Sequence, residues 1–411
     1  MSEGHEVHHD EPSTFTAPAP VKSLAIGLMA LGGVGFGLSW IGGANMAWSG
    51  WLIGSWIALG FALFGIFFIA STSLANGAWP AVLKRVPEAM TRYFPVAALT
   101  IGGVAIGLLT SHLYEWTHPE LQEGEHRHQV DGKSAWLNTP WWLIRTVIYF
   151  AIWIGFSWMI VGLSRKQDAD GNVKHTFTTK KLSAVFCFFF ALTVSAASID
   201  YIKSIEPVWF STMFGPYQFA GIFESGWAML AILLILLRKN GYLKNVVNEN
   251  HFHNLGQWLV ASSTFWAYLW FCQFMLIWYS NIPEETQHYF ARWEGPWFWV
   301  TFVVNPILNW VIPFLVLLPR SNKRNIRLVG IVSVIVLIGR FVDLWQFVLP
   351  RPHAGHDGPV AHYLPLESFG LVFVAAGFVG AFIFVVMKAL EKAPLLAKKD
   401  PFYEESLHHH L

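Results

Sequence analysis

A few ionisable side chains interrupt the long apolar stretches of this sequence, where a charge is costly to bury. Arg340 and Asp343 are three residues apart, so they share one face of a helix and can form an ion pair. Glu224 has no basic residue in its own apolar stretch, and Asp200 and His112 lie near the ends of theirs. Carboxyl and imidazole groups are the usual proton carriers inside membranes. These five residues are therefore candidates for a functional site.

Two interpretations of these residues remain open. In the first, Glu224, Asp343, Asp200 and His112 carry protons in a water-accessible cavity or path that opens toward the outer side. In the second, the charges are neutralised pairs, Arg340 with Asp343 above all, that fix how the helices meet. Placing an isolated ionisable group at mid-membrane costs about 2.5–3.5 kcal/mol. Such a residue is retained either because it has a function or because a partner neutralises its charge. For Arg145, Lys203 and Glu115, near span ends, we expect interfacial positions with the charge reaching toward water.

The elements that would hold these residues are apolar stretches of 20 residues or more. Hydrophobic residues make up 54% of the 411 residues and charged residues only 13%, against about 25% in soluble domains. Each stretch is long enough to cross a hydrocarbon layer roughly 30 Å thick. The sequence therefore predicts an all-α membrane protein with about ten transmembrane helices. The expected spans are 23–42, 50–76, 93–116, 141–163, 182–202, 215–237, 255–281, 297–318, 327–349 and 367–390.

The distribution of Lys and Arg indicates the orientation of these helices. Twenty of them lie in the two tails and in alternate loops, and five lie in the remaining loops. Cytoplasmic loops are enriched in basic residues, so both termini are expected on the cytoplasmic side. At 1.5 Å per residue, Arg340 and Asp343 then fall in the middle and outer half of the membrane, as does Glu224.

A weak internal repeat relates helices 2–5 to helices 6–9. Asp200 and Asp343 each precede a proline by seven residues, and helices 4 and 8 open with Pro140-Trp141 and Pro296-Trp297. A repeat of this kind predicts two similar four-helix bundles in the same orientation. The expected division is a disordered tail (1–21), a flanking helix (22–49), two bundles (50–214 and 215–350), and an outer loop, tenth helix and cytoplasmic tail (351–411).

The composition argues against several kinds of site. Cys187 and Cys272 lie in apolar stretches and are too few for an iron–sulfur cluster or a structural zinc. Of the 17 histidines, only His112 falls inside an expected span, so haem held by paired histidines is not expected. The loop pairs His126/His128, His251/His253 and His353/His356 are expected to be solvated. The net charge of +1 gives no indication of nucleic acid binding. Gly33/Gly37 and Gly103/Gly107 have the spacing of close helix contacts.

Several runs resemble the NrfD-like family, the membrane subunits of the polysulfide-reductase type. They are Ser198-Ile199-Asp200-Tyr201 with Glu206-Pro207, residues 209–214, His251-Phe252-His253 before the seventh helix, and Phe265-Trp266-Ala267-Tyr268. The resemblance covers the chain after about residue 22. It implies a subunit of a respiratory quinol:electron-acceptor oxidoreductase, such as alternative complex III, in the bacterial cytoplasmic (inner) membrane. This subunit would have no redox centre of its own. The resemblance also implies a family site near Asp200 and Tyr201.

The resemblance further implies which groups lie in this chain and which in its partners. No cofactor is expected to be bound tightly here, although a quinone such as menaquinone could bind. Haem c and iron–sulfur clusters would belong to partner subunits: an iron–sulfur protein, cytochrome c subunits and a second NrfD-like subunit. Membrane lipid is a further partner. The chain would contribute a proton-conducting path, a quinone pocket or both.

Two alternatives to a respiratory subunit are a secondary transporter built on a parallel repeat and a purely structural membrane anchor. Transporters usually interrupt paired helices near mid-membrane. Prolines here lie mostly at span ends, except Pro306 and Pro313 in the eighth helix, which weakly favours a rigid subunit.

Overall fold

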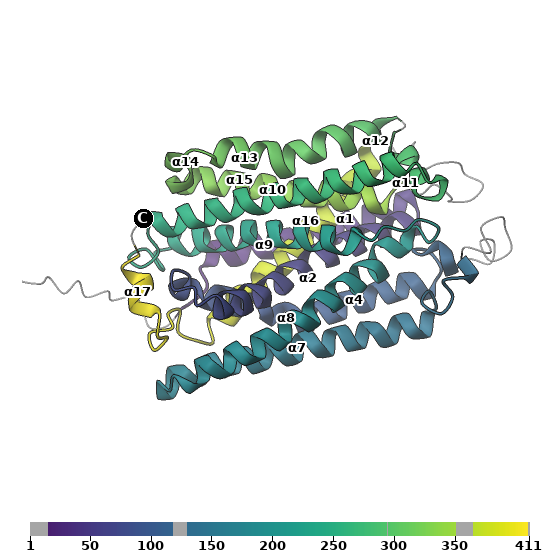
Figure 1. The fold of residues 1–411 in the computed structure, drawn as a ribbon. Helices are drawn as coiled ribbons and strands as arrows, with labels where there is room; N and C mark the ends of the chain where they lie inside the picture. The colour runs from purple at the N-terminus through teal and green to yellow at the C-terminus, as the bar shows by residue number, and fades with distance from the viewer. Residues whose placement is uncertain (1–14, 118–129, 294, 351–364, 410–411) are drawn as a thin grey trace, which may run out of the picture.

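The computed structural model describes residues 15–117, 130–293, 295–350 and 365–409. Within these residues the regular structure is helical, and ten helical stretches are long and apolar enough to cross a membrane. The long helices lie side by side along one axis, with α17 (Tyr403–Leu407) at one end and α11 (Pro283–Trp293) at the other (Figure 1). The expected all-α fold is confirmed, and the protein is a multi-pass membrane protein.

The ten spans follow the expected order along the chain. They are built from α1 (Ala19–Ser39), α2 (Ala44–Leu74), α4 (Phe94–Leu109), α7 (Thr139–Asp170), α8 (Lys174–Tyr201), α9 (Phe214–Lys239), α10 (Glu249–Ser280), α12 (Pro296–Trp299) with α13 (Ile312–Leu317), α15 (Ile326–Val348) and α16 (Pro365–Leu390). The third span begins earlier, at Ala81, and includes α3 (Arg85–Met90). We refer to the basic end, where α17 and α14 (Arg320–Arg324) lie, as the cytoplasmic end.

Several helix ends differ from the expectation because capping decides them and apolar length does not. The helices α7 and α8 run through most of the expected loop at 164–181, and Gly171 ends α7 in the left-handed region (φ 71°). In contrast, α4 stops at Leu109, and Ser111 turns the chain with a φ of 55°. His112 therefore lies beyond the helix that was expected to contain it.

The helices contact one another in two similar rings. In the first, α2 contacts α4 and α8, and α7 contacts α4 and α8. In the second, α9 contacts α10 and α15, and α13 contacts α10 and α15. The rings correspond helix by helix to the expected bundles, and α2 and α9 join them. Because α2 is apolar on all sides and 94% of its most apolar segment is buried, it forms the centre of the fold.

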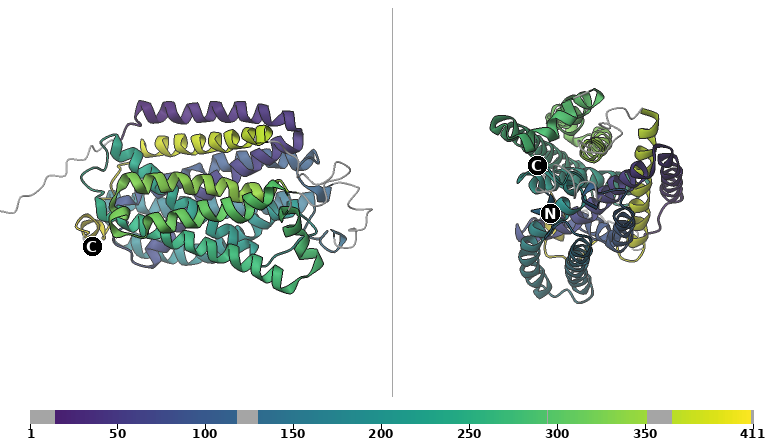
Figure 2. Two further views of the ribbon diagram at one scale, coloured as in Figure 1. Left: turned by 90° about the horizontal axis from the view of Figure 1, so that it is seen from above. Right: turned by 90° about the vertical axis from the view of Figure 1, so that its right-hand side faces the viewer.

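The first and tenth spans pack against each other at one edge of the molecule (Figure 2). Gly32 and Gly377 face each other so closely that a Cβ on Gly32 would lie 2.5 Å from the Cα of Gly377. The expected close contact through Gly33 and Gly37 is wrong within the described part of the chain, where nothing lies within 4 Å of a Cβ at either position. Instead, α1 packs against α16 through Gly32 and Gly35. Gly103 does make the expected close contact, with Trp51.

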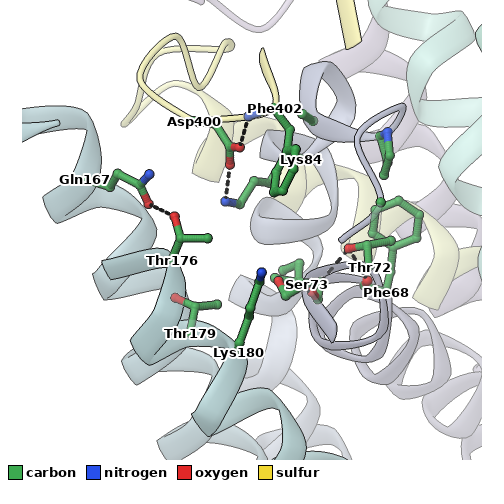
Figure 3. A pocket seen from close by; sticks show the side chains of 14 residues that line it. Phe68, Thr72, Ser73, Lys84, Gln167, Thr176, Thr179, Lys180, Asp400 and Phe402 are labelled. Carbon is green, nitrogen blue, oxygen red and sulfur yellow. Dashed lines mark hydrogen bonds and ion pairs between the residues drawn. The ribbon is translucent and has the colours of Figure 1, made fainter. Parts of the chain in front are cut away.

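The described parts of both tails are packed at the cytoplasmic end. Residues 15–18, expected in a disordered tail, are ordered: Tyr242 Oη donates to the Thr16 carbonyl at 3.1 Å, and the Ala17 amide donates to Glu391 at 3.0 Å. The C-terminal segment is held by an ion pair of 2.6 Å between Lys84 and Asp400, which both line a small pocket (Figure 3). The first 14 residues lie outside the described part of the chain.

Candidate functional site: a buried polar network

Asp343 receives hydrogen bonds from its own helix, α15, and from two others, α9 and the eighth span. Arg340, one turn earlier on α15, donates from Nη1 to Oδ2 at 2.6 Å, so the expected ion pair is confirmed. Tyr217 of α9 donates its hydroxyl to Oδ1, and Asn305 of the eighth span donates to the same oxygen at 3.3 Å. Gln346 adds a weaker contact at 3.4 Å. The carboxylate is fully buried, so its charge depends on these donors.

Arg340 extends the network toward the first bundle. Its Nη2 donates to Gln218 Oε1 at 2.8 Å, and Trp56 of α2 donates to the same oxygen at 3.2 Å. The guanidinium occupies space directly over Gly221, which has no side chain to compete for it. We call Tyr217, Gln218, Asn305, Arg340, Asp343 and Gln346 the polar network.

Glu224 lies on α9 one helical turn beyond Gly221 and is 1% exposed. Among the described residues, its Oε1 has no hydrogen-bond partner. Because Gly221 packs against the Arg340 guanidinium, Glu224 lies on the same side of α9 as the ion pair. Glu224, which has no basic residue in its own apolar stretch, therefore lies at the end of the polar network that is nearer the membrane centre.

The eighth span adopts an unusual backbone where it meets Asp343. Two π-helical segments, Val300–Val304 and Ile307–Val311, lie on either side of Asn305 and Pro306. Proline cannot donate a backbone hydrogen bond, so it disrupts the regular helical ladder. Asn309 donates to the Asn305 carbonyl at 3.0 Å and to its side chain at 2.7 Å. Such π segments are frequent at functional sites.

A second cluster lies at the outer end of the same bundle, and the sequence did not single it out. Glu206 accepts from Arg292 and, at 2.8 Å, from His288 Nδ1; a carboxylate can only accept, so the imidazole donates. The His288 ring stacks on Trp209 with centroids 3.8 Å apart. His288 and Arg292 share the inner face of α11, one turn apart, and this amphipathic helix was expected to be a loop. We call Glu206, His288 and Arg292 the outer cluster.

The outer cluster is buried, and this sets the protonation of its members. Burial alone would raise the pKa of Glu206, but Arg292 and His288 outweigh it and lower that pKa to about 2. Burial and the charge of Arg292 lower the pKa of His288 to about 4, although Glu206 acts in the opposite direction. At neutral pH the cluster therefore holds an ionised Glu206, a charged Arg292 and a neutral His288.

The outer cluster and the polar network are joined through Gln346. Arg292 Nε donates to the Gln346 carbonyl at 2.8 Å, and the Gln346 side chain contacts Asp343. Polar contacts therefore run from Glu206 near the outer surface, through Arg292 and Gln346, to Asp343 and Arg340. Glu224 continues the line toward the membrane centre.

The first bundle holds an equivalent carboxylate, but its environment is closed. Asp200 accepts two hydrogen bonds of 2.8 Å from Arg145, one of 2.8 Å from Tyr149 and one of 2.8 Å from Trp136. The expectation that Arg145 reaches toward interfacial water is wrong, because Asp200 draws its guanidinium into the bundle. Four hydrogen bonds satisfy this carboxylate, which favours the interpretation of Asp200 and Arg145 as a neutralised pair.

The two carboxylates are contacted from equivalent places in the predicted repeat. Tyr149 is nine residues after Pro140, and Asn305 is nine residues after Pro296; each donates to the aspartate of its own bundle. This correspondence could have been found by aligning the two halves of the sequence.

Tyr201 and His112 do not join the polar network. The Tyr201 hydroxyl donates to Thr146 at 3.1 Å within the first bundle, and its ring packs edge-on against Trp56. Trp56 therefore touches both Tyr201 and Gln218 and links the two bundles. His112 lies after the end of α4, so its expected place within the third helical span is wrong.

The expectation of solvated histidines at 251 and 253 is also wrong. Both lie near the start of α10 and are buried. His251 closes a capping box with Asn248, which ties the start of α10 to the preceding loop. Among the described residues no cluster of three His, Cys, Asp or Glu side chains has the arrangement of a metal site. The other two histidine pairs lie outside the described residues.

An apolar groove of about 570 Å³ runs along the opposite face of α15. Phe341, Val342 and Trp345 line it from α15, and residues of α16 and of the eighth span complete it. The indole Nε1 of Trp345 is buried and has no acceptor within the described part of the chain. No protein-family model and no curated protein matches this chain.

Proposed function

We propose that this chain is a membrane subunit of a respiratory quinol:electron-acceptor oxidoreductase of the bacterial cytoplasmic membrane. Its second bundle conducts protons between the membrane centre and the outer face. One observation carries the proposal: the line of polar contacts from Glu206 to Arg340, continued by a buried Glu224 with one unpartnered oxygen. A buried ionisable group in a span that lacks a full set of partners indicates function by default, because pairing does not repay the cost of its desolvation.

The chemistry of quinol oxidation explains why such a subunit needs a proton path. Oxidation of a quinol to a quinone yields two electrons and two protons. Iron–sulfur clusters and haem c of partner subunits would accept the electrons, and the protons would leave at the outer face. Asp343 is suited to a relay, since Tyr217, Asn305 and Gln346 can stabilise its charge while Arg340 rearranges. The NrfD-like resemblance supports this assignment.

A quinone pocket is the second candidate, and the groove along α15 favours it. Its apolar walls suit an isoprenoid tail, and the free Trp345 N–H could donate to a quinone carbonyl. However, residues 341, 342 and 345 lie on the face of α15 opposite Asp343 and Arg340. A quinone in the groove would not touch the polar network, so proton conduction is the better supported role.

A secondary transporter receives limited support. The two π segments interrupt the eighth span near its middle, as transporter helices are interrupted. The equivalent helix α7 is continuous over its 32 residues, whereas transporter interruptions come in pairs. The paired arrangement that a transporter requires is missing from these two helices.

Purification in mild detergent tests the assignment to a redox complex. The chain is expected to co-purify with subunits that carry haem c and iron–sulfur clusters, visible in the absorption and paramagnetic resonance spectra. A colourless, monodisperse monomer from the native membrane would contradict the proposal and favour a transporter.

Infrared spectroscopy tests whether water reaches Glu224. A protonated Glu224 carboxyl contributes a stretching band that Glu224→Gln removes, and exchange into heavy water is expected to shift that band within minutes. A band that resists exchange for hours would show a sealed carboxyl and would contradict a proton path.

A further inference from the structure

Three helix ends form a basic pocket of about 370 Å³ at the cytoplasmic end of the molecule. Arg92 comes from the start of the third span, Arg165 from the last turns of α7, and Lys388 from the end of α16, with Lys392 just after it. The other lining residues are apolar, Phe384, Val385 and Ala389, and no acidic residue lines the pocket. The site is separate from the polar network and does not depend on the proposed function.

The acidic residues around this pocket neutralise only one of its four basic side chains. Glu391 pairs with Lys388 at 3.0 Å and with Lys22 at 3.1 Å, and Glu88 is bound by Arg85. In the described ranges of the chain, no ion pair involves Arg92, Arg165 or Lys392. The pocket therefore keeps a positive charge that the chain itself does not neutralise.

Arg92 and Arg165 line the same pocket, where two like charges repel each other. Arg165 is only partly exposed, and its Nε is buried with no acceptor among the described residues. The neighbouring basic pocket of Figure 3 differs, because Asp400 neutralises Lys84 there. A bound anion would satisfy Arg165 Nε and relieve the repulsion.

We propose that this pocket binds the phosphate of an anionic phospholipid from the cytoplasmic leaflet. Guanidinium groups match phosphate oxygens in two-pronged hydrogen bonds, which suits Arg92 and Arg165. Phe384 and Val385 of α16 lie on the membrane side, where they can pack against an acyl chain. Basic pockets between transmembrane helices at the cytoplasmic side have the chemistry that anionic headgroups require. A free phosphate ion shares the headgroup chemistry but not the acyl contact.

Native mass spectrometry of the full-length chain in detergent tests this site. Phosphatidylglycerol, phosphatidylcholine or inorganic phosphate is added to the delipidated protein, and the fraction carrying each is measured. The variants are Arg92→Gln, Arg165→Gln and both together, with Lys166→Gln as a matched control that removes an exposed charge next to the pocket on the same helix. The unfolding temperature of each variant checks that it is folded.

Phosphatidylglycerol is expected to bind better than phosphatidylcholine. Each arginine substitution is expected to weaken it about fivefold and the double substitution roughly 30-fold, while Lys166→Gln leaves binding unchanged. Equal losses in Lys166→Gln and Arg165→Gln would show a general surface attraction and overturn the proposal. Displacement of the lipid by millimolar phosphate would identify a soluble-anion site and overturn it as well.

Discussion

The guanidinium of Arg340 lies directly over Gly221, in space that any side chain at residue 221 would fill. This contact joins α15 to α9 and aims Arg340 at both Asp343 and Gln218. The position of the buried ion pair thus depends on a residue that carries no chemistry itself.

Gly221→Ala is therefore expected to displace Arg340 and to destabilise the protein by about 1–3 kcal/mol, as overpacking does in other cores. The free energy of unfolding in mixed micelles measures this loss. Gly102→Ala is the control, because a Cβ at Gly102 meets nothing within 4 Å. Equal stability of the two variants would show that Arg340 can move aside without cost.

A double-mutant cycle measures how far Arg340 and Asp343 depend on each other. Arg340→Met leaves Asp343 as a buried charge with only neutral donors, so we expect a loss of about 3–5 kcal/mol. Arg340→Met with Asp343→Leu removes both charges and is expected to be more stable than Arg340→Met alone. Additive losses in the unfolding experiment would show that the two residues are not coupled.

The outer cluster is expected to make stability fall as the pH falls. The pKa of His288 is lowered to about 4 in the folded protein, so the unfolded chain takes up the proton first, near its usual 6.5. Stability is thus complete above pH 6.5 and declines as the pH falls toward 4. Glu206, with its pKa lowered to about 2, adds a further decline below its usual 4.5.

Unfolding temperatures between pH 7.5 and 4 measure this dependence. His288→Gln keeps a donor for Glu206 and is expected to flatten the decline between pH 6.5 and 4.5, leaving the part that begins near 4.5. An unchanged profile in His288→Gln would show that other groups cause the decline.

Asp200 is expected to be structural and not part of a proton path. Asp200→Asn would weaken the contacts with Arg145, Tyr149 and Trp136, and we expect less folded protein in the membrane. The assembled fraction should release as many protons per electron as the wild type. A lowered ratio in correctly assembled protein would place Asp200 on the path.

The sequence predicts the helices well because membrane insertion is decided by local properties. Apolar length and the positive-inside rule depend on neighbouring residues, so ten spans and the Arg340–Asp343 pair could be predicted. Partners from other helices could not, because contact between Tyr217 and Asp343 depends on how α9 and α15 pack. Arg145 illustrates the difference: its position near a span end suggested the interface, but Asp200 on α8 holds it inside.

The outer cluster was missed for a related reason. α11 has few apolar residues, so hydropathy assigns it to a loop, although His288 and Arg292 four residues apart are consistent with one face of a helix. A residue-by-residue alignment of the two halves would have added a contact that the spans alone do not give, because it relates Tyr149 to Asn305.

Proton release by the assembled complex in sealed vesicles tests the central claim most directly. The measurement is the number of protons released at the outer face per electron passed to the acceptor, for the wild type, Glu224→Gln and Asp200→Asn. The account predicts a strongly reduced ratio or stalled turnover in Glu224→Gln, and a wild-type ratio in Asp200→Asn. Wild-type turnover and proton release in Glu224→Gln would contradict it.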